Sequence, residues 1–347
     1  MQDTSLAPHG TALRRRSTDQ APGMQRVRPP SLLLATGVRM NLHWSAEALW
    51  EQLEPLLPGL TVEVVANSPS TNTVLLERAR AEAEPREADT DGIAQVRRSR
   101  ESAAFGRRAA DLQPCLLVAE HQTQGRGRMG RAWTASPGAS LTFSLSVPMN
   151  PSDWSGLSLA VGVALAEALD PSPSGAPRIG LKWPNDLWLM DGPPGTDGVR
   201  GRKLGGILIE TCAVGATRMA VVGVGLNVTP QPVGELGQGY ACLQELDPQA
   251  SAPEVLSRVA APLVRALLDF SVHGFARTAE RFDARDLLRG HPVVSLNHEG
   301  GVLAEGIAEG VSTQGALRLR TANGLVDIGS GEVSVRLRPA SAADAAC

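Results

Sequence analysis

The sequence predicts an α+β protein, in which one mixed, mostly antiparallel sheet carries helices and a small β-barrel follows. Up to about residue 289, short segments with the apolar alternation of strands are mixed with segments of helical periodicity, at hairpin-like spacings. After Pro292 the character changes to short strand-like segments separated by glycine-rich turns, which is the pattern of a small barrel.

The chain begins its predicted ordered part with a helix. Ser45 is expected as the N-cap, followed by an acidic first turn and an apolar face. Thr61–Ala66 alternates as a strand, and the turn from Ser70 to Asn72 caps a second helix. Residues 80–111 are rich in Arg, Glu, Asp and Ala, with few large apolar groups, and are predicted to form a mobile surface insertion.

The middle of the chain continues with strands and helices, and Gly162 allows close packing inside an apolar helix. The expected elements are strands at Leu116–Ala119 and Leu141–Val147, a helix at Leu157–Leu169, strands at Lys203–Glu210 and Met219–Val228, and helical structure over residues 254–289. The expected barrel strands are Val293–Leu296, Val302–Ile307, Ala316–Leu319 and Val333–Leu337.

Two terminal segments lie outside these elements. Residues 1–40 carry six arginines against two acidic residues and lack a hydrophobic period, which predicts a disordered tail. A transit peptide, or a true start at Met24 or Met40, would explain the same composition. The main domain is expected to span residues 41–289, the barrel residues 290–338, and a second tail residues 339–347.

The composition is that of an ordinary globular protein, and the use of cysteine suggests a reducing cellular compartment. Of the 347 residues, 42% are hydrophobic and 20% charged, and the net charge of −3 gives no overall footprint for nucleic acid. The four cysteines form no C-x-x-C pair and the six histidines no H-E-x-x-H motif, so neither a disulfide framework nor a zinc site is expected. Without an apolar run of about 20 residues, the protein is predicted to be soluble and cytoplasmic.

The stretch Gly125–Trp133 carries the strongest chemical signal in the chain. Three glycines, three arginines and a tryptophan fall within nine residues. Glycine permits close backbone approach, arginine binds carboxylate or phosphate, and tryptophan offers a face for a base, so we expect a nucleotide site. The stretch also spells G-x-G-x-x-G, but a Rossmann loop opens into a helix, whereas this one leads to a predicted strand.

Together with four other segments in the same order, this loop resembles the biotin–protein ligase family. The likeness runs from about residue 61 to 338 and includes the family's SH3-like barrel on a core similar to class II aminoacyl-tRNA synthetases. The segments are Ser70–Asn72, Gln122–Trp133, Lys182–Asp186 (K-W-P-N-D), Arg202–Glu210 and Gly223–Asn227.

The resemblance implies a two-step ligation that uses biotin, ATP and Mg²⁺. Biotin's carboxylate attacks the α-phosphate to give biotinyl-5′-AMP, and a lysine of a biotin carboxyl carrier protein, a part of a biotin-dependent carboxylase, then takes the biotinyl group. The barrel is expected to aid ATP binding and carrier docking, with a pure packing role as the alternative. A homodimer through the sheet is a further expectation from the family.

The resemblance assigns roles within the loop and on the lysine-bearing strand. Arg126 is expected to bind biotin's carboxylate and the adenylate phosphate, and Lys203 to offset charge on the pentavalent transition state. The implied catalytic residues are Lys203, Arg126, Arg128 and Asp186. The implied ATP and adenylate contacts are Arg126, Arg128, Arg131, Trp133, Asn185 and Asn227.

The biotin head is expected in a mostly apolar slot with a few polar groups. Ser70, Thr71 and Gln122 would hydrogen-bond its ureido ring. The implied biotin-binding residues are Ser70, Thr71, Asn72, Gln122, Gly125, Arg126, Lys203, Gly206 and Ile207. Asn185 or Asp186 would orient Lys203 or help to hold magnesium, and the metal ligands stay unassigned.

Some features depart from the family pattern, and other interpretations stay open. Met129 stands where many members have an arginine, and residues 191–201 make a longer turn than the usual tight hairpin. A single expected helix before the first strand predicts neither a DNA-binding domain nor repressor function. A lipoate–protein ligase would share the fold and the adenylate chemistry. A non-catalytic sensor of biotin or nucleotide would leave Lys203 and the loop arginines unexplained.

Overall fold

A computed structural model of the chain describes residues 42–83, 112–171, 176–192, 201–231, 239–331 and 333–337. The expectations for the two tails, for residues 84–111 of the insertion and for residues 193–200 of the long turn lie outside the described residues. Residues 80–83 of the expected insertion belong instead to a helix, α2 (Thr71–Ala83).

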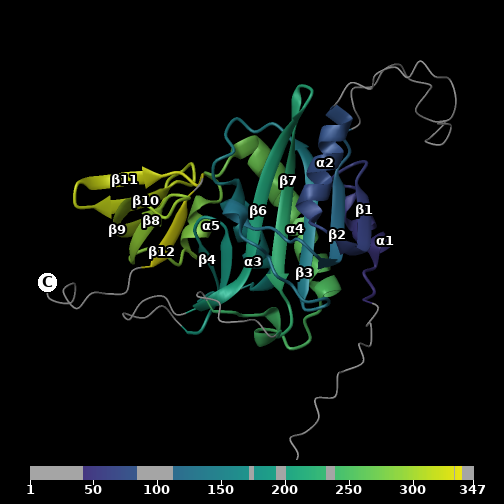
Figure 1. Cartoon of the computed structure of the whole chain (residues 1–347), viewed down its shortest axis with the longest axis horizontal. Coiled ribbons are helices and arrows are strands. Elements are labelled where there is room, and N and C mark those ends of the chain that lie inside the picture. Colours follow the sequence, from purple (N-terminus) through teal and green to yellow (C-terminus); the bar gives the residue numbers. More distant parts are fainter. Residues whose placement is uncertain are drawn as a thin grey trace, which may run out of the picture. The chain divides into compact units, whose positions relative to one another are not determined.

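A seven-stranded mixed sheet forms the centre of the main domain (Figure 1). Its strands are β1 (Thr61–Ser68), β2 (Cys115–Gln122), β3 (Ser140–Met149), β4 (Ile179–Lys182), β5 (Asp186–Met190), β6 (Gly201–Val214) and β7 (Thr217–Asn227). They lie in the order β1-β2-β3-β7-β6-β5-β4. β1 and β2 are parallel and the other neighbouring pairs are antiparallel, which confirms the predicted sheet.

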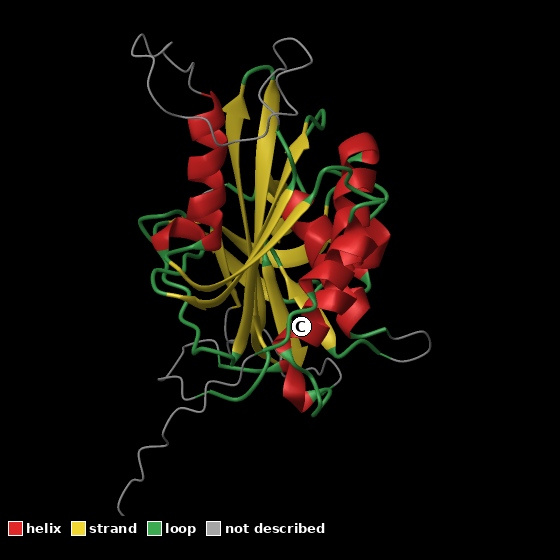
Figure 2. Cartoon of the chain, turned by 90° about the vertical axis from the view of Figure 1, so that its right-hand side faces the viewer, coloured by secondary structure: helices red, strands yellow, loops and turns green. Residues whose placement is uncertain are grey.

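Helices cover both faces of this sheet (Figure 2). On one face α2 packs over β2, β3, β6 and β7, with a small apolar cluster beneath it. On the other face lie α1 (Ala46–Leu53), α3 (Leu157–Leu169), α4 (Ala252–His273) and the short α5 (Ala279–Asp283). The sheet is therefore the middle of three layers, and its α2 face is free to carry a site beyond the start of that helix.

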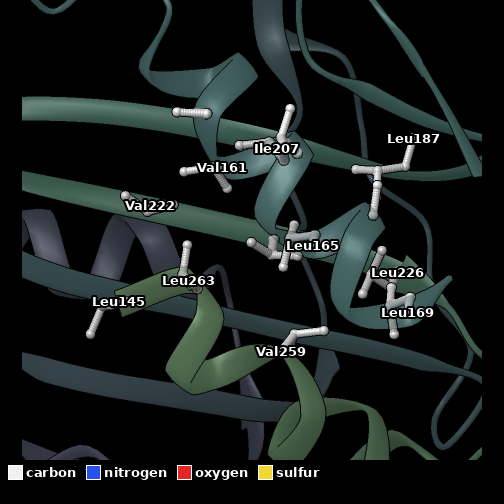
Figure 3. Packing of buried hydrophobic residues seen from close by; sticks show 14 of the residues in the cluster. Leu145, Val161, Leu165, Leu169, Leu187, Ile207, Val222, Leu226, Val259 and Leu263 are labelled. Atoms are coloured by element: carbon white, nitrogen blue, oxygen red, sulfur yellow. The ribbon is translucent and has the colours of Figure 1, made fainter. Parts of the chain in front are cut away.

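The main core lies between the sheet and the pair α3 and α4 (Figure 3). Val161 and Leu165 of α3 are fully buried, as are Val259 of α4 and Val222 of β7. α3 is apolar on most of its surface, apart from Ser158 and Glu167, because it lies between the sheet and α4. Gly162 favours this close packing, since a Cβ there would make a tight contact at 3.3 Å with Leu181 Cδ2.

Two expectations for the helices were wrong. Ser45 is at the N-cap position of α1, as expected, and Glu47 is in the first turn, but Ser45 has φ 46° and its side chain makes no cap hydrogen bond, so only the side-chain cap was wrong. Helical structure does not continue from residue 254 to 289, because α4 ends at His273 before Gly274, whose φ is +66°. The segment around Asp286 instead pairs with β4, where Leu181 N donates to Arg285 O at 2.7 Å.

The C-terminal part is a five-stranded antiparallel sheet, consistent with the expected SH3-like domain. Its strands are β8 (Pro292–Leu296), β9 (Val302–Val311), β10 (Leu317–Thr321), β11 (Gly324–Ile328) and β12 (Ser334–Leu337), in the order β11-β10-β9-β8-β12. β11 was not expected, since its residues are mostly exposed at an edge. β4 and β5 were not among the strands expected from periodicity, although the hairpin expected around residues 191–201 implies a strand in the position of β5. Buried Trp183 anchors this part to the main domain through a 3.0 Å hydrogen bond from Nε1 to Gly315 O.

Candidate functional site

A pocket opens on the α2 face of the sheet, between the start of α2, the loop after β2, and strands β5 to β7. It encloses about 770 Å³, its open mouth included. Residues from all the predicted segments meet here, although they are far apart in the sequence. The predicted residues that line it are Ser70, Thr71, Asn72, Gln122, Arg126, Arg128, Arg131, Trp133, Asn185, Asp186, Lys203, Gly206 and Ile207.

The glycine–arginine loop folds as a tight hairpin over one side of the pocket. Gly127 N donates to Arg131 O at 2.7 Å, and Trp133 N donates to Gly125 O at 2.8 Å. The turn is made by Met129 and Gly130 in the left-handed region, with φ 55° and 69°. Gly125 is required because a Cβ would lie 2.4 Å from Trp133 O, so this residue shapes the loop and does not itself line the pocket.

The indole of Trp133 packs on the backbone of β7 at Gly225. A Cβ at Gly225 would lie 2.6 Å from Trp133 Cε2, so a glycine is needed at that point of the strand. The indole Nε1 is buried and has no hydrogen-bond partner. The ring is thus held by packing at one side of the pocket, in keeping with both a stacking platform and a residue that pins the loop.

Lys203 and Asp186 form the central ion pair of the pocket. Lys203 Nζ donates to Asp186 Oδ1 at 2.7 Å, and the two side chains are 30% and 14% exposed. A β-bulge makes this possible, because Leu187 pairs with Gly205 and Trp188 with Lys203, which leaves Leu204 unpaired with β5. The bulge brings Lys203 and Gly206, three residues apart, to the same pocket.

Further cations surround the Asp186 carboxylate. Burial lowers the pKa of Lys182, and so do the charges of Lys203 and Arg131, whereas Asp186 raises it. The Lys182 ammonium lies 4.8 Å from the centre of the Trp188 ring. One carboxylate among several cations leaves a positive electrostatic potential at this end of the pocket, which suits a polyanionic ligand such as a nucleoside triphosphate.

Arg128 links the loop to the C-terminal sheet. Its Nη1 donates to Asn185 Oδ1 at 3.4 Å, and its Nη2 donates to the carbonyl oxygens of Ser330 and Gly331. Burial lowers the pKa of this guanidinium, while Asp186 raises it. The segment between β11 and β12 thus holds one of the predicted phosphate-binding arginines at the rim of the pocket.

The opposite end of the pocket is neutral and polar. Thr71 N donates to Gln122 Oε1 at 2.8 Å, which fixes the side chain of Gln122 against the start of α2. Ser70 Oγ accepts a 3.4 Å hydrogen bond from Thr73 N, as the predicted cap, and is otherwise available to a ligand. Ser70, Thr71 and Asn72 are all buried, so the polar groups here are screened from bulk water.

Arg126 lines the pocket and is held beside its polar end. Its Nη2 is 2.6 Å from Glu210 Oε1, and its Nη1 donates to Thr73 Oγ1 at 3.0 Å. The guanidinium therefore reaches from the loop to β6 and to the first turn of α2. Part of its fork stays free to meet a carboxylate or a phosphate.

The predicted contact of Asn227 with adenine or ribose finds no support in its position. Its side chain is buried and does not line the pocket. Nδ2 donates to Lys203 O at 3.3 Å and to Ala241 O at 3.0 Å, so Asn227 holds the backbone of the lysine-bearing strand. Its observed role is structural, since a polar side chain at a strand end can satisfy backbone carbonyl groups of neighbouring segments.

Sequence reasoning missed several residues of the site. Ser144 of β3 and Glu210 of β6 join the polar network beneath α2, and Gly223 leaves room for Asn72, because a Cβ would lie 2.2 Å from Asn72 Oδ1. The signal was present in β3, where Ser140, Thr142, Ser144 and Ser146 alternate with apolar residues and all four are buried. A buried polar row on a strand predicts hydrogen-bonded partners on the facing element.

The described residues offer no set of side chains for a permanently bound metal ion. No group of three or more His, Cys, Asp or Glu side chains gathers there in a way that could hold a metal ion. Asp186 is the one carboxylate among the described pocket-lining residues. Magnesium commonly uses one or two carboxylates together with substrate phosphates, so this set fits an ion that arrives with a nucleotide.

Two further expectations concern the environment of the chain. No helix within the described residues is long and apolar enough to cross a membrane. The three cysteines within the described residues, Cys115, Cys212 and Cys242, are free and buried, and burial raises the pKa of each of the three thiols.

Comparison with known proteins matches both parts of the chain. Residues 107–227 match the Biotin/lipoate A/B protein ligase family, and residues 293–336 match the Biotin protein ligase C terminal domain. The chain is 33% identical over 328 residues to the Biotin–[acetyl-CoA-carboxylase] ligase of Mycobacterium tuberculosis, which covers 90% of this chain and 98% of that protein.

Other relatives differ more in extent. The Bifunctional ligase/repressor BirA of Salmonella typhimurium is 34% identical over 63% of this chain, and the match spans 66% of that protein's length. The Biotin protein ligase from Aquifex aeolicus, solved in complex with biotin and ATP, superposes with a TM-score of 0.58 at 25% identity, over 80% of this chain and 99% of the other. On this basis the chain belongs to the biotin–protein ligase family.

Proposed function

We propose that the protein activates biotin with ATP to biotinyl-5′-AMP and transfers the biotinyl group to one lysine of a biotin carboxyl carrier protein. The observation that carries this proposal is the layout of one pocket. A neutral polar end formed by Ser70, Thr71 and Gln122 faces a cationic end centred on the Lys203–Asp186 pair. Biotin has the same division, with a polar neutral head and a carboxylate tail.

In the first step a carboxylate oxygen of biotin attacks the α-phosphorus of ATP. A new acyl–phosphate bond forms, and the bond to the β-phosphate breaks with its electron pair on pyrophosphate. Charge builds on the α-phosphoryl oxygens, where Lys203 and Arg126 offset it. Arg128 and Arg131 neutralise the departing phosphates. Asp186 orients the Lys203 ammonium, since the two already lie 2.7 Å apart.

In the second step the neutral ε-amine of the carrier lysine attacks the acyl carbon of the mixed anhydride. The amide bond forms, AMP leaves with the electron pair of the broken acyl–oxygen bond, and the amine loses a proton to solvent. Water must be kept from the anhydride before that attack. The hairpin formed by residues 125–133 lies beside the pocket and is placed to cover it.

ATP enters this reaction as Mg·ATP. Asp186 and Asn185 supply the side-chain oxygens nearest the cationic end, and the phosphates supply most of the ion's ligands. Trp133 offers its indole face to adenine at the side of the pocket formed by β7. The relatives named above support biotin over lipoate, since their names specify biotin ligation.

The partners and location follow from the same proposal. The named substrate of the Mycobacterium tuberculosis relative makes the carrier domain of acetyl-CoA carboxylase the first carrier to test. Free buried cysteines fit a reducing cytosol. A homodimer through the sheet stays a proposal from the family, as does the division into a catalytic domain at 41–289 and a barrel at 290–338.

The test is transfer of labelled biotin to an isolated carrier domain with Mg·ATP, with lipoate as the competing substrate. We expect incorporation of biotin at one lysine, and pyrophosphate exchange that depends on biotin. Lys203→Met should abolish most of this transfer. Its matched control is Arg218→Met, at an exposed position of β7 outside the pocket, which should keep the wild-type rate. Exchange that runs equally well with lipoate would favour a lipoate ligase, and binding without any exchange would favour a sensor.

A further inference from the structure

A continuous chain of hydrogen bonds runs beneath the polar end of the pocket, from β6 through α2 to β3. Glu210 Oε2 accepts from Asn72 Nδ2 at 3.0 Å, and Asn72 Oδ1 accepts from Ser144 Oγ at 2.6 Å. The hydroxyls of Ser144 and Thr71 are 2.6 Å apart, and Thr71 Oγ1 is 3.2 Å from Gln122 Oε1. Five side chains thus form one path, whose far end lines the pocket.

The direction of the chain is fixed at Asn72. Its Nδ2 lies 3.1 Å from Leu208 O and 3.0 Å from the Glu210 carboxylate, and both of these groups can only accept hydrogen bonds. A flipped amide would place an oxygen against two oxygens, one of them charged. The NH₂ group therefore faces β6, and the amide oxygen faces Ser144.

The orientation of the Asn72 amide determines which atom donates each hydrogen bond along this path. Ser144 has a single hydroxyl proton, and it is given to Asn72 Oδ1. The short contact between the two hydroxyls therefore uses the proton of Thr71, which donates to Ser144 Oγ. The 3.2 Å contact of the same hydroxyl with Gln122 Oε1 is longer than its 2.6 Å contact with Ser144, and Gln122 Oε1 already receives a 2.8 Å hydrogen bond from Thr71 N, so the single Thr71 proton goes to Ser144. Thr71 Oγ1 accordingly has no proton left for a ligand.

We propose that Glu210, Asn72 and Ser144 set the polarity of the pocket, so that the Thr71 hydroxyl can only accept and the bound head group must present an N–H to it. The inference rests on the proposed function, because it identifies that N–H with a ureido nitrogen of biotin. Neither Ser144 nor Glu210 needs to contact the ligand for this, so both act as positioning residues that determine specificity.

This fixed hydrogen-bond polarity of Thr71 gives a physical reason why the pocket should reject carboxylic acids other than biotin, such as lipoate. The dithiolane ring of lipoate has no N–H group, so in this pocket it would leave the Thr71 lone pair unpaired. An analogue with an oxygen in place of the N–H would bring two acceptors together. An unpaired or opposed buried acceptor is expected to weaken binding by about 10- to 100-fold.

The test compares biotin with the two cyclic-carbamate analogues in which one ureido N–H is replaced by oxygen. Binding to the full chain is measured by titration calorimetry. For the wild-type protein we expect at least one analogue to bind about 10- to 100-fold more weakly than biotin. Ser144→Ala frees the Thr71 hydroxyl to turn and donate. The ratio of the analogue's Kd to the Kd of biotin should therefore shrink about tenfold in this variant.

A matched control is available on the same face of β3. Ser146 is also buried, and its hydroxyl donates to Cys115 O at 3.4 Å, away from the pocket. Ser146→Ala should keep the full ratio. Asn72→Leu removes the acceptor of Ser144 by a different change and should shrink the ratio as Ser144→Ala does, with circular dichroism as the check on folding.

The outcomes separate this inference from the proposed function. A smaller ratio in Ser144→Ala, with an unchanged ratio in Ser146→Ala, supports the fixed polarity. Normal biotin transfer with the same ratio in Ser144→Ala as in the wild-type protein overturns this inference alone. A wild-type protein that binds no biotin overturns both.

Discussion

Lys203 and Asp186 meet at 2.7 Å from adjacent strands of one hairpin, at the point where β6 carries an extra residue. The bulge at Leu204 sends the Leu204 side chain into the core and leaves Lys203 in the pocket beside Gly206. A Cβ at Gly206 would lie 3.5 Å from Asp186 Oδ1 and 3.6 Å from Lys203 Nζ, so the glycine keeps the space over the pair open. The ion pair is thus accessible to a ligand and still fixed by backbone geometry.

The first prediction concerns this pair. Lys203→Met should lower the rate of biotin-dependent pyrophosphate exchange by about 10²–10³-fold, because a positioned charge is lost from the transition state. Asp186→Asn should lower this rate less, since the Lys203 ammonium stays but loses its fixed position. The double variant should be close to Lys203→Met alone, because the two residues act as a unit. Additive losses in a single-turnover assay would contradict the coupling.

The second prediction uses two glycines of β7 that lie two residues apart. Gly223→Ala would bring a Cβ within 2.2 Å of Asn72 Oδ1 and should weaken biotin binding about 10- to 100-fold. Gly225→Ala would press on the Trp133 indole instead, and should raise the KM for ATP more than the Kd for biotin. Titration calorimetry and exchange kinetics give the two readouts. Equal effects on both ligands in both variants would contradict this division of the pocket.

The third prediction addresses the contact between the loop and the C-terminal sheet. Arg128→Lys keeps the charge but loses the planar fork that reaches Asn185 and the Ser330 and Gly331 carbonyls. We expect the KM for ATP to rise about tenfold with little change in biotin affinity. Amide exchange in residues 329–331 should quicken in the same variant. Unchanged exchange would mean that Arg128 does not hold this segment.

The fourth prediction is a pH dependence of stability. The pKa of Asp286 is raised to about 6, chiefly by burial and also by the charge of Asp283, against the lowering effects of the Leu288 N–H and Arg289. The folded state therefore binds more protons than the unfolded state between about pH 4 and 6, so this group makes stability fall as pH rises through that window. Above it the penalty is constant and amounts to up to about 3 kcal/mol.

Asp286→Asn mimics the protonated side chain and keeps an oxygen for the 2.9 Å hydrogen bond from Leu288 N. The variant should be more stable than the wild-type protein at pH 7 and show no gain at pH 4. Urea unfolding at both pH values measures the difference. The same stability difference at both values would show that the carboxyl group titrates normally.

Much of the fold could be predicted because strong local patterns decided it. The apolar run of α3 has the expected bounds of Leu157–Leu169, and the ends of β6 and β7 lie within four and two residues, respectively, of the expected ends. β11 was missed because its residues are mostly exposed and lack a buried apolar face. β4 and β5 flank the K-W-P-N-D segment, which was identified by its motif and not by periodicity. The end of α4 was missed because Gly274 stops the helix in a region that still looked apolar and helical.

By itself, the sequence determined which groups this protein brings to its chemistry: the glycine–arginine loop, Lys203, Asp186 and the polar turn at Ser70. Only the tertiary structure decided how they are used. A bulge at Leu204, contacts between residues as far apart as Arg128 and Ser330, and the path from Glu210 to Thr71 all depend on pairing between distant segments. Local periodicity carries no information about such pairing, because a hydrogen bond's direction is set by partners that the fold supplies.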